Sequence, residues 1–284
     1  MIKKSILITC YNRPDALKKC INYLYLSNNI DNYNVVFVRQ KGNLKVKTLV
    51  NKAKFKNKFS IETSYPKKFS PLKKMANNGF TGWNFCFNKL LSDYSIYLED
   101  DIMVNYDFLN FHEFIHKKYI NDPNFFGVNG FSGEKFQKSK ISKYSKYVYG
   151  LGKGFSINKR VWKIFKNKIW NKKFLVKKVP SLDSANEEYV KSNNTYVVMP
   201  ACSRLFELPT NGLHIKKTDT IYFNRLKKSF VKEKYKKKFY KYSFFIRYNW
   251  RGDCKKYKGT VINYLSIKLR LFFNNYRVKL NKYL

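Results

Sequence analysis

The segment Tyr94-Ser-Ile-Tyr-Leu-Glu99-Asp100-Asp101-Ile-Met-Val104 decides how this chain folds. An apolar run ends in three consecutive acids, and a second apolar run follows. The whole chain has 18 Asp plus Glu against 58 Lys plus Arg, so three adjacent acids need an explanation. Like charges packed together raise one another's pKa unless a cation neutralises them. Oxygen-only ligands suit Mg²⁺ or Mn²⁺, while the alternative is a solvated turn after a strand.

Segments of strand length alternate with segments of helical periodicity along the chain. Residues 5–10 and 34–39 predict two buried strands, and Asp15 is the expected cap of a helix between them. This alternation predicts an α/β fold, with a mixed, mostly parallel sheet flanked by helices. Ligands bind such sheets where the strands end, which places residues 9–13 and 99–101 in one crevice.

The segment before the acidic run has a different pattern. Residues 77–82 contain two Asn and two Gly and therefore favour a loop. A helix is expected from Trp83 to Leu91, because its apolar side chains recur on one face.

The charge of the chain is unusually high. A net charge of +40 is typical of proteins that bind nucleic acid or an anionic membrane. The accompanying excess of Asn, Ile, Phe and Tyr is also what an AT-rich genome produces, so both explanations stay open. Residues 225–284 hold 19 Lys plus Arg but only two acids. We therefore predict a globular domain over 1–224 and a basic, aromatic-rich, helical extension over 225–284.

The cysteines and the apolar segments bear on the compartment. The five cysteines are odd in number and form no C-x-x-C pair, so neither a disulfide framework nor a zinc site is expected. Reduced, buried thiols fit a cytoplasmic protein. The apolar start is too short for a signal peptide, and we find no run of about 18 apolar residues that would span a membrane. We expect attachment, if any, at the inner face of a membrane.

Several segments, taken in order, resemble a known enzyme family. They are Thr9-Cys-Tyr-Asn-Arg-Pro14, Trp83-Asn-Phe-Cys-Phe-Asn88, Tyr97-Leu-Glu-Asp-Asp-Ile102, Tyr149-Gly-Leu-Gly-Lys-Gly-Phe155, the acids between Asp183 and Glu188, and Ser203-Arg204 followed by Asn211-Gly-Leu-His214. The chain resembles the GT-A fold glycosyltransferases, and is most similar to the N-acetylglucosaminyltransferase I branch and its bacterial and viral relatives. The resemblance covers about residues 5–215. It implies a Rossmann-like sheet and transfer of a sugar from a nucleotide with inversion.

The resemblance also implies a role for each matched residue. Asp101 would bind Mn²⁺ or Mg²⁺, Asp100 would contact the donor sugar, and Glu99 would orient the nucleotide. Gly152 would line the donor crevice, although a flexible loop explains such glycines equally well. The loop after the first strand would hold the base and ribose through Thr9, Cys10, Tyr11, Asn12 and Arg13.

One departure concerns the nucleobase. The segment Val38-Arg-Gln-Lys41 lacks the acid that reads uracil in N-acetylglucosaminyltransferase I. The identity of the base therefore stays open, with a UDP-sugar favoured.

Inverting transfer needs a carboxylate that accepts the proton of the acceptor hydroxyl. Asp183, Glu187 and Glu188 lie in the expected segment, and we favour Asp183. On a helix Glu187 shares a face with Asp183, so both remain candidates beside the simpler interpretation of a solvated face. His214 is open between a metal ligand, a contact to the diphosphate and a surface histidine.

The sequence therefore predicts a metal-dependent glycosyltransferase that acts on a glycan or glycolipid acceptor. The basic extension would hold it at an anionic membrane surface. The alternative is a nucleic-acid-binding protein that uses the basic, aromatic tail. Against that alternative, the sequence shows no helix-turn-helix, RRM or zinc pattern, and the acidic triplet would repel phosphates unless a cation is bound.

Overall fold

The computed structural model describes residues 2–132, 137–148, 151–170, 182–208 and 243–244. All of them belong to the first of two units, Met1–Phe245. The predicted boundary at 224/225 lies outside the described residues, and of the predicted helical extension the structure describes Ser243–Phe244, which form a short strand. The boundary and the rest of the extension stay predictions.

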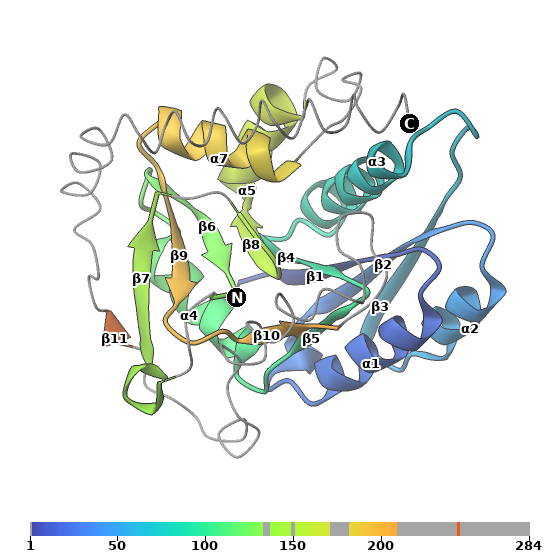
Figure 1. Cartoon of the computed structure of the whole chain (residues 1–284), viewed down its shortest axis with the longest axis horizontal. Helices are drawn as coiled ribbons and strands as arrows, with labels where there is room; N and C mark the ends of the chain where they lie inside the picture. The colour runs from blue at the N-terminus through green and yellow to red at the C-terminus, as the bar shows by residue number, and fades with distance from the viewer. Residues whose placement is uncertain (1, 133–136, 149–150, 171–181, 209–242, 245–284) are drawn as a thin grey trace, which may run out of the picture. The chain divides into compact units, whose positions relative to one another are not determined.

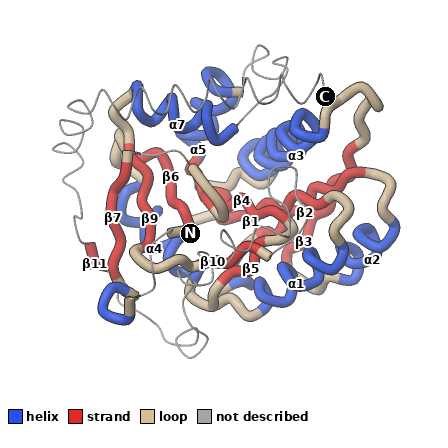
Figure 2. Tube along the Cα trace, in the orientation of Figure 1, coloured by secondary structure: helices blue, strands red, loops and turns tan. Residues whose placement is uncertain are grey.

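The described strands form a mixed sheet in the order β11-β7-β9-β6-β8-β4-β1-β2-β3, and a small sheet pairs β10 with β5 (Figure 2). The bounds in the first half of the chain are β1 Lys4–Cys10, β2 Asn34–Gln40, β3 Asn57–Thr63, β4 Tyr94–Glu99, β5 Ile102–Val104 and β6 Phe125–Asn129. Those of the second half are β7 Lys143–Tyr147, β8 Phe155–Asn158, β9 Tyr196–Pro200, β10 Leu205–Glu207 and β11 Ser243–Phe244.

Most strand pairs in the large sheet are parallel. β1 runs parallel to β2 and β4, and β3, β9 and β11 also have parallel neighbours. β8 is antiparallel to both β4 and β6, and β7 is antiparallel to β9. The predicted mixed, mostly parallel sheet is therefore confirmed.

Helices flank the sheet. They are α1 Pro14–Tyr25, α2 Leu44–Lys52, α3 Pro71–Asn84, α4 Phe108–Tyr119, α5 Lys159–Ile164 and α7 Leu182–Ser192, with short turns η1 Ile30–Asn32, η2 Phe85–Lys89, η3 Lys138–Lys140 and η4 Phe165–Ile169. Figure 1 shows α1 and α2 on one side of the β1–β4 region and α3 on the other. None of the helices in the described part is long and apolar enough to cross a membrane.

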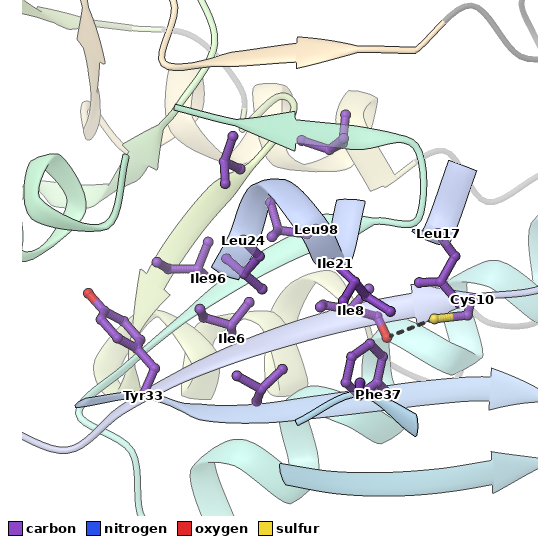
Figure 3. Packing of buried hydrophobic residues seen from close by; sticks show 14 of the residues in the cluster. Ile6, Ile8, Cys10, Leu17, Ile21, Leu24, Tyr33, Phe37, Ile96 and Leu98 are labelled. Atoms are coloured by element: carbon purple, nitrogen blue, oxygen red, sulfur yellow. Dashed lines mark hydrogen bonds between the residues drawn. The ribbon is translucent and has the colours of Figure 1, made fainter. Parts of the chain in front are cut away.

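Each face of the sheet has its own hydrophobic core. On the α1 face, Ile6 and Ile8 of β1 pack with Leu17, Ile21 and Leu24 of α1 (Figure 3). The opposite face is aromatic and centres on the fully buried Trp83. Because both faces are covered, every residue of β1 is buried, as expected for a central parallel strand.

Two expectations about helix boundaries are wrong. Helix α1 begins at Pro14, so Asp15 lies in the first turn and Arg13 occupies the N-cap position. Proline is favoured at the first helical position because its missing N–H would have no partner there. The expected loop over 77–82 is instead part of α3. Its Gly82 lies against Leu7 of β1, where a Cβ would clash with the leucine side chain, so glycine brings the helix close to the sheet.

Candidate functional site

The site is built where β1 and β4 end. Thr9 pairs with Glu99 in the last step of the parallel register, so the two strands stop at the same level. The chain leaves β1 through residues 11–13, and it leaves β4 through Asp100 and Asp101. The two segments that the sequence predicts to meet, 9–13 and 99–101, therefore lie side by side, although almost 90 residues separate them in the chain.

The cation nearest to the acids is a side chain of the protein. Arg13 bridges two acids, with Nη1 2.5 Å from Asp101 Oδ2 and Nη2 bonded to Asp100 Oδ1. The other oxygen of Asp100 accepts a hydrogen bond from the Tyr11 backbone N–H at 3.3 Å. Asp100 and Asp101 are 1% and 3% exposed, whereas the Arg13 side chain keeps 24% of its surface in contact with solvent. Two buried acids thus share one half-buried guanidinium.

Burial sets the electrostatics of this group. Burial raises the pKa of Glu99 to about 7. The negative charge of Asp101 raises this pKa further, and the positive charge of Arg13 lowers it. Burial also raises the pKa of Asp100 to about 6, again against the effect of Arg13. For Arg13, burial works to lower the pKa, but the three carboxylates outweigh it and the pKa is raised. The group therefore holds more negative charge than its immediate cation balances.

A second ion pair, which the sequence analysis missed, borders the triplet. Lys153 pairs with Glu207 of β10, and β10 is antiparallel to β5, which directly follows the acids. The Leu208 backbone N–H donates to the Asp101 carbonyl at 2.9 Å, so Glu207 is one residue from the strand partner of Asp101. Lys153 also acts to lower the pKa of Glu99. The scarcity of acids was the available signal, because Glu207 is one of only 18.

The glycine-rich segment is held against β6. Gly152 N–H donates to the Asn129 side chain at 2.7 Å, and the Gly154 carbonyl accepts from Gly130 N–H at 2.9 Å. Gly154 has a φ of +55°, and a Cβ there would clash with Leu205. The backbone on either side of Lys153 is therefore fixed, which aims that side chain at Glu207.

The loop after β1 offers few side chains to a ligand. Thr9 is buried and its hydroxyl lies 3.1 Å from the Tyr97 hydroxyl. Cys10 is also buried, and burial raises the pKa of its thiol well above the usual value. Tyr11 and Asn12 are exposed. Of the five residues expected to hold the nucleotide, Tyr11, Asn12 and the half-exposed Arg13 are thus the ones with accessible side chains.

The predicted base candidates all lie on α7. Asp183 is in its first turn, but its side chain lies outside the described part. Glu187 is partly exposed and pairs with Lys191 one turn later, and Glu188 is exposed. Glu187 therefore contacts its own helix and not the acidic group. Which of the three is the base stays a prediction.

The histidines that the structure describes belong to the core. His112 Nδ1 and His116 Nε2 each lie 2.7 Å from the Ser156 hydroxyl, and all three residues are fully buried. Burial lowers the pKa of His112 to about 3, so both rings are neutral at ordinary pH. They brace β8 just after the glycine-rich segment. His214, the histidine predicted as a metal ligand, lies outside the described residues.

The acidic group suits a divalent cation in charge and in chemistry. When ionised, Glu99, Asp100, Asp101 and Glu207 carry four negative charges, and Arg13 and Lys153 supply two positive ones, which leaves two negative charges. All the donors are carboxylate oxygens, which Mg²⁺ and Mn²⁺ prefer. Within the described ranges, however, no three His, Cys, Asp or Glu side chains are arranged to hold a metal ion. The positive charge in contact with Asp100 and Asp101 is that of Arg13.

Known proteins resemble this chain in structure but not in sequence. No family model and no curated protein matches the sequence. Among solved structures, S. aureus TarS 1-349 matches with a TM-score of 0.51 and 12% identity, over 73% of this chain and 61% of that one.

This likeness shows that the chain shares its fold with TarS. A longer TarS structure matches with the same TM-score and identity, over 72% of this chain and 36% of TarS. The chain therefore spans about three fifths of TarS 1-349. The predicted GT-A type of fold agrees with this likeness.

Proposed function

We propose that this chain is a glycosyltransferase that takes its sugar from a nucleotide-sugar donor, with a UDP-sugar favoured, and delivers it to a glycan or glycolipid acceptor. The observation that carries the proposal is the buried pair Asp100 and Asp101, which follows Glu99 at the end of β4 and is held by Arg13 from the end of β1. It lies at the strand ends of a sheet where ligands of α/β proteins bind, on a fold shared with a glycosyltransferase.

Different residues of the site would bind different parts of the donor. Arg13 and Lys153 are the two cations at the crevice, and a diphosphate is an anion that guanidinium and ammonium groups bind. Asp100 would accept hydrogen bonds from sugar hydroxyls, and the exposed Tyr11 and Asn12 would contact the base and ribose. Gly152 would line the donor site, and a Cβ there would have its nearest neighbours on Asn129 at 3.8 Å or more.

The proposed cofactor is Mn²⁺ or Mg²⁺. Asp101 would hold it, with His214 as a candidate second ligand from the part of the chain that is not described. A metal ion at this position would neutralise the charge that develops on the departing nucleoside diphosphate.

The proposed base is a carboxylate on α7. Asp183 is favoured, and Glu187 and Glu188 are the alternatives on the same helix. The chosen carboxylate would accept the proton of the acceptor hydroxyl while that oxygen attacks the sugar, which would give transfer with inversion. The similarity to the N-acetylglucosaminyltransferase I branch remains a prediction.

The basic extension is proposed to bind an anionic membrane surface. Such binding weakens as salt screens the charges. Full-length protein should bind anionic liposomes at low salt, and protein truncated after residue 224 should bind them less. Tight, salt-sensitive binding of the extension to RNA, without lipid preference, would instead support the nucleic-acid alternative.

The proposed activity can be tested with a panel of nucleotide sugars. Purified protein with Mn²⁺ or Mg²⁺ should release the nucleoside diphosphate from one donor faster than from the others. The Glu62→Gln variant, altered at the ion pair that joins Arg39 of β2 to Glu62 of β3, should behave as wild type. Absence of release from every donor, with and without metal and acceptor extracts, would contradict the proposal.

A further inference from the structure

Arg13 occupies the place in which a metal ion would have to bind. Its guanidinium bridges Asp100 and Asp101, and the remaining oxygen of Asp100 is held by the Tyr11 N–H at 3.3 Å. A free cation that approaches Asp101 therefore meets a positive charge already in position. To bind, it must displace that charge from two buried carboxylates.

The same guanidinium is more exposed than the two acids that it holds. The Arg13 side chain is 24% exposed, while those of Asp100 and Asp101 are 2% and 4% exposed. It sits at the N-cap position of α1 but makes no side-chain cap hydrogen bond there. The acids are fixed at the end of β4 by the sheet, so any exchange of partners at this site moves Arg13 and leaves the acids in place.

A diphosphate offers Arg13 an alternative partner. Guanidinium binds phosphate oxygens with the same forked geometry that it uses for carboxylates. When Arg13 turns to a diphosphate, Asp101 is released with its negative charge, and the diphosphate adds charge of the same sign. Both changes favour the entry of a divalent cation.

We propose that Arg13 is an internal counter-ion that keeps metal out of the empty site and admits it only together with the donor diphosphate. This inference rests on the proposed function for the identity of the diphosphate. The first consequence of the inference is a low affinity for metal in the absence of a donor. This consequence depends on Arg13 and the two acids, and not on the identity of the donor. By linkage, UDP must raise the affinity for Mn²⁺ by the same factor by which Mn²⁺ raises the affinity for UDP.

The test measures Mn²⁺ binding to full-length protein by electron paramagnetic resonance, first with MnCl₂ alone. Arg13→Gln should bind Mn²⁺ at least tenfold more tightly than wild type, and adding Asp101→Asn to that variant should remove the gain. Arg39→Gln, which opens an ion pair on the neighbouring strand, is the matched control and should bind as wild type does. Arg13→Lys keeps the positive charge but cannot bond both acids as a guanidinium does. Its Mn²⁺ affinity should lie between those of wild type and Arg13→Gln, so it replaces Arg13→Gln if that variant does not fold.

The same titrations with UDP present complete the test. UDP should raise the Mn²⁺ affinity of wild type by at least tenfold and that of Arg13→Gln by much less. Equal Mn²⁺ affinity of wild type, Arg13→Gln and Arg13→Lys without UDP would overturn the inference, whatever UDP does. Failure of every protein to bind UDP would count against the proposed function, while the measurement with MnCl₂ alone would still decide the role of Arg13.

Discussion

Arg13 follows strand β1, and Arg39 lies near the end of the neighbouring strand β2, but the acids that they pair with differ in exposure. Arg39 is opposite Cys10 in the register, and it pairs with Glu62 of β3, whose side chain is 39% exposed. Arg13 instead pairs with two acids that are almost fully buried. Water already stabilises Glu62, so its ion pair adds little. The negative charges of Asp100 and Asp101 are shielded from water, so a neighbouring cation must stabilise them.

This difference in the exposure of the acids indicates that a ligand would bind at the Arg13 group and not at the Arg39–Glu62 pair. The Arg39–Glu62 pair joins adjacent strands, with side chains 12% and 39% exposed, so the acid stays in contact with water when the pair is broken. Buried carboxylates are costly to maintain, and burial raises the pKa of both Glu99 and Asp100. Such groups gather where a ligand supplies the missing charge. Substitutions at matched positions of the two pairs should therefore have effects of very different size.

The largest difference is expected in catalysis. Asp101→Ala should reduce transfer by about 10³-fold or more, the upper range for the loss of one preorganised electrostatic contact, and Glu62→Ala should leave it within twofold. The measurement is the rate of nucleoside diphosphate release at saturating donor, with circular dichroism to show that both variants fold. Retained activity of Asp101→Ala with unchanged Mn²⁺ dependence would remove this residue from the site.

A smaller effect is expected from the proposed base. Asp183→Asn should lower kcat by about 10²-fold or more, with donor affinity nearly unchanged, because a general base acts in the transfer step and not in binding. Glu187→Gln is the control on the same helix face, where the side chain already pairs with Lys191. If Glu187→Gln or Glu188→Gln shows the loss of kcat instead, the choice of Asp183 is wrong while the mechanism stands.

The sheet and the position of the crevice could be predicted from the sequence, because strand-length apolar runs and strand ends are local patterns. The three adjacent acids also predicted a cation beside them, which was expected to be Mn²⁺ or Mg²⁺, and that metal stays a prediction. That Arg13 is the cation in contact with the acids did not follow, because the contact joins residues 88 positions apart. Lys153 and Glu207 were missed for the same reason.

The helix over 77–82 shows a second limit of local patterns. Two Asn and two Gly favour a loop, but Gly79 and Gly82 serve close packing of α3 against Trp170 and Leu7. That packing depends on β1 and on η4, which lie far away in the sequence. Tertiary contacts therefore override the local preference.

The raised pKa values predict how stability changes with pH. Glu99 and Asp100 bind protons more tightly when folded, at pKa values of about 7 and about 6, than they would in an unfolded chain. Their contribution to the free energy of unfolding is therefore complete below about pH 4 and is lost as the pH rises to about 7. At about 1.4 kcal/mol per pKa unit, the loss from Glu99 is about 3 kcal/mol.

Urea denaturation between pH 4 and pH 8 measures this effect. Glu99→Gln should flatten the dependence on pH, because the side chain no longer titrates, and Glu62→Gln should leave it unchanged. The same slope in wild type and Glu99→Gln would mean that Glu99 is not the group that titrates.

The smallest effects are expected in the glycine-rich segment. A Cβ at Gly152 would lie 3.8 Å or more from its nearest neighbours, so Gly152→Ala should change the free energy of unfolding by no more than about 0.5 kcal/mol. Gly154→Ala places a side chain at a φ of +55° against Leu205, and should cost about 2 kcal/mol. A rise in the KM for donor in the stable Gly152→Ala protein would support a place for Gly152 in the donor crevice, and an unchanged KM would argue against it.

The central claim is that the buried acids at the end of β4 receive a nucleoside diphosphate together with a cation. Calorimetric titration of UDP in the presence of Mn²⁺ tests it most directly, with wild type, Asp101→Ala and Glu62→Ala compared under one condition. The account predicts binding to wild type and Glu62→Ala with equal affinity, and at least about tenfold weaker binding to Asp101→Ala. Equal affinity in all three proteins, or no binding to wild type, would contradict it.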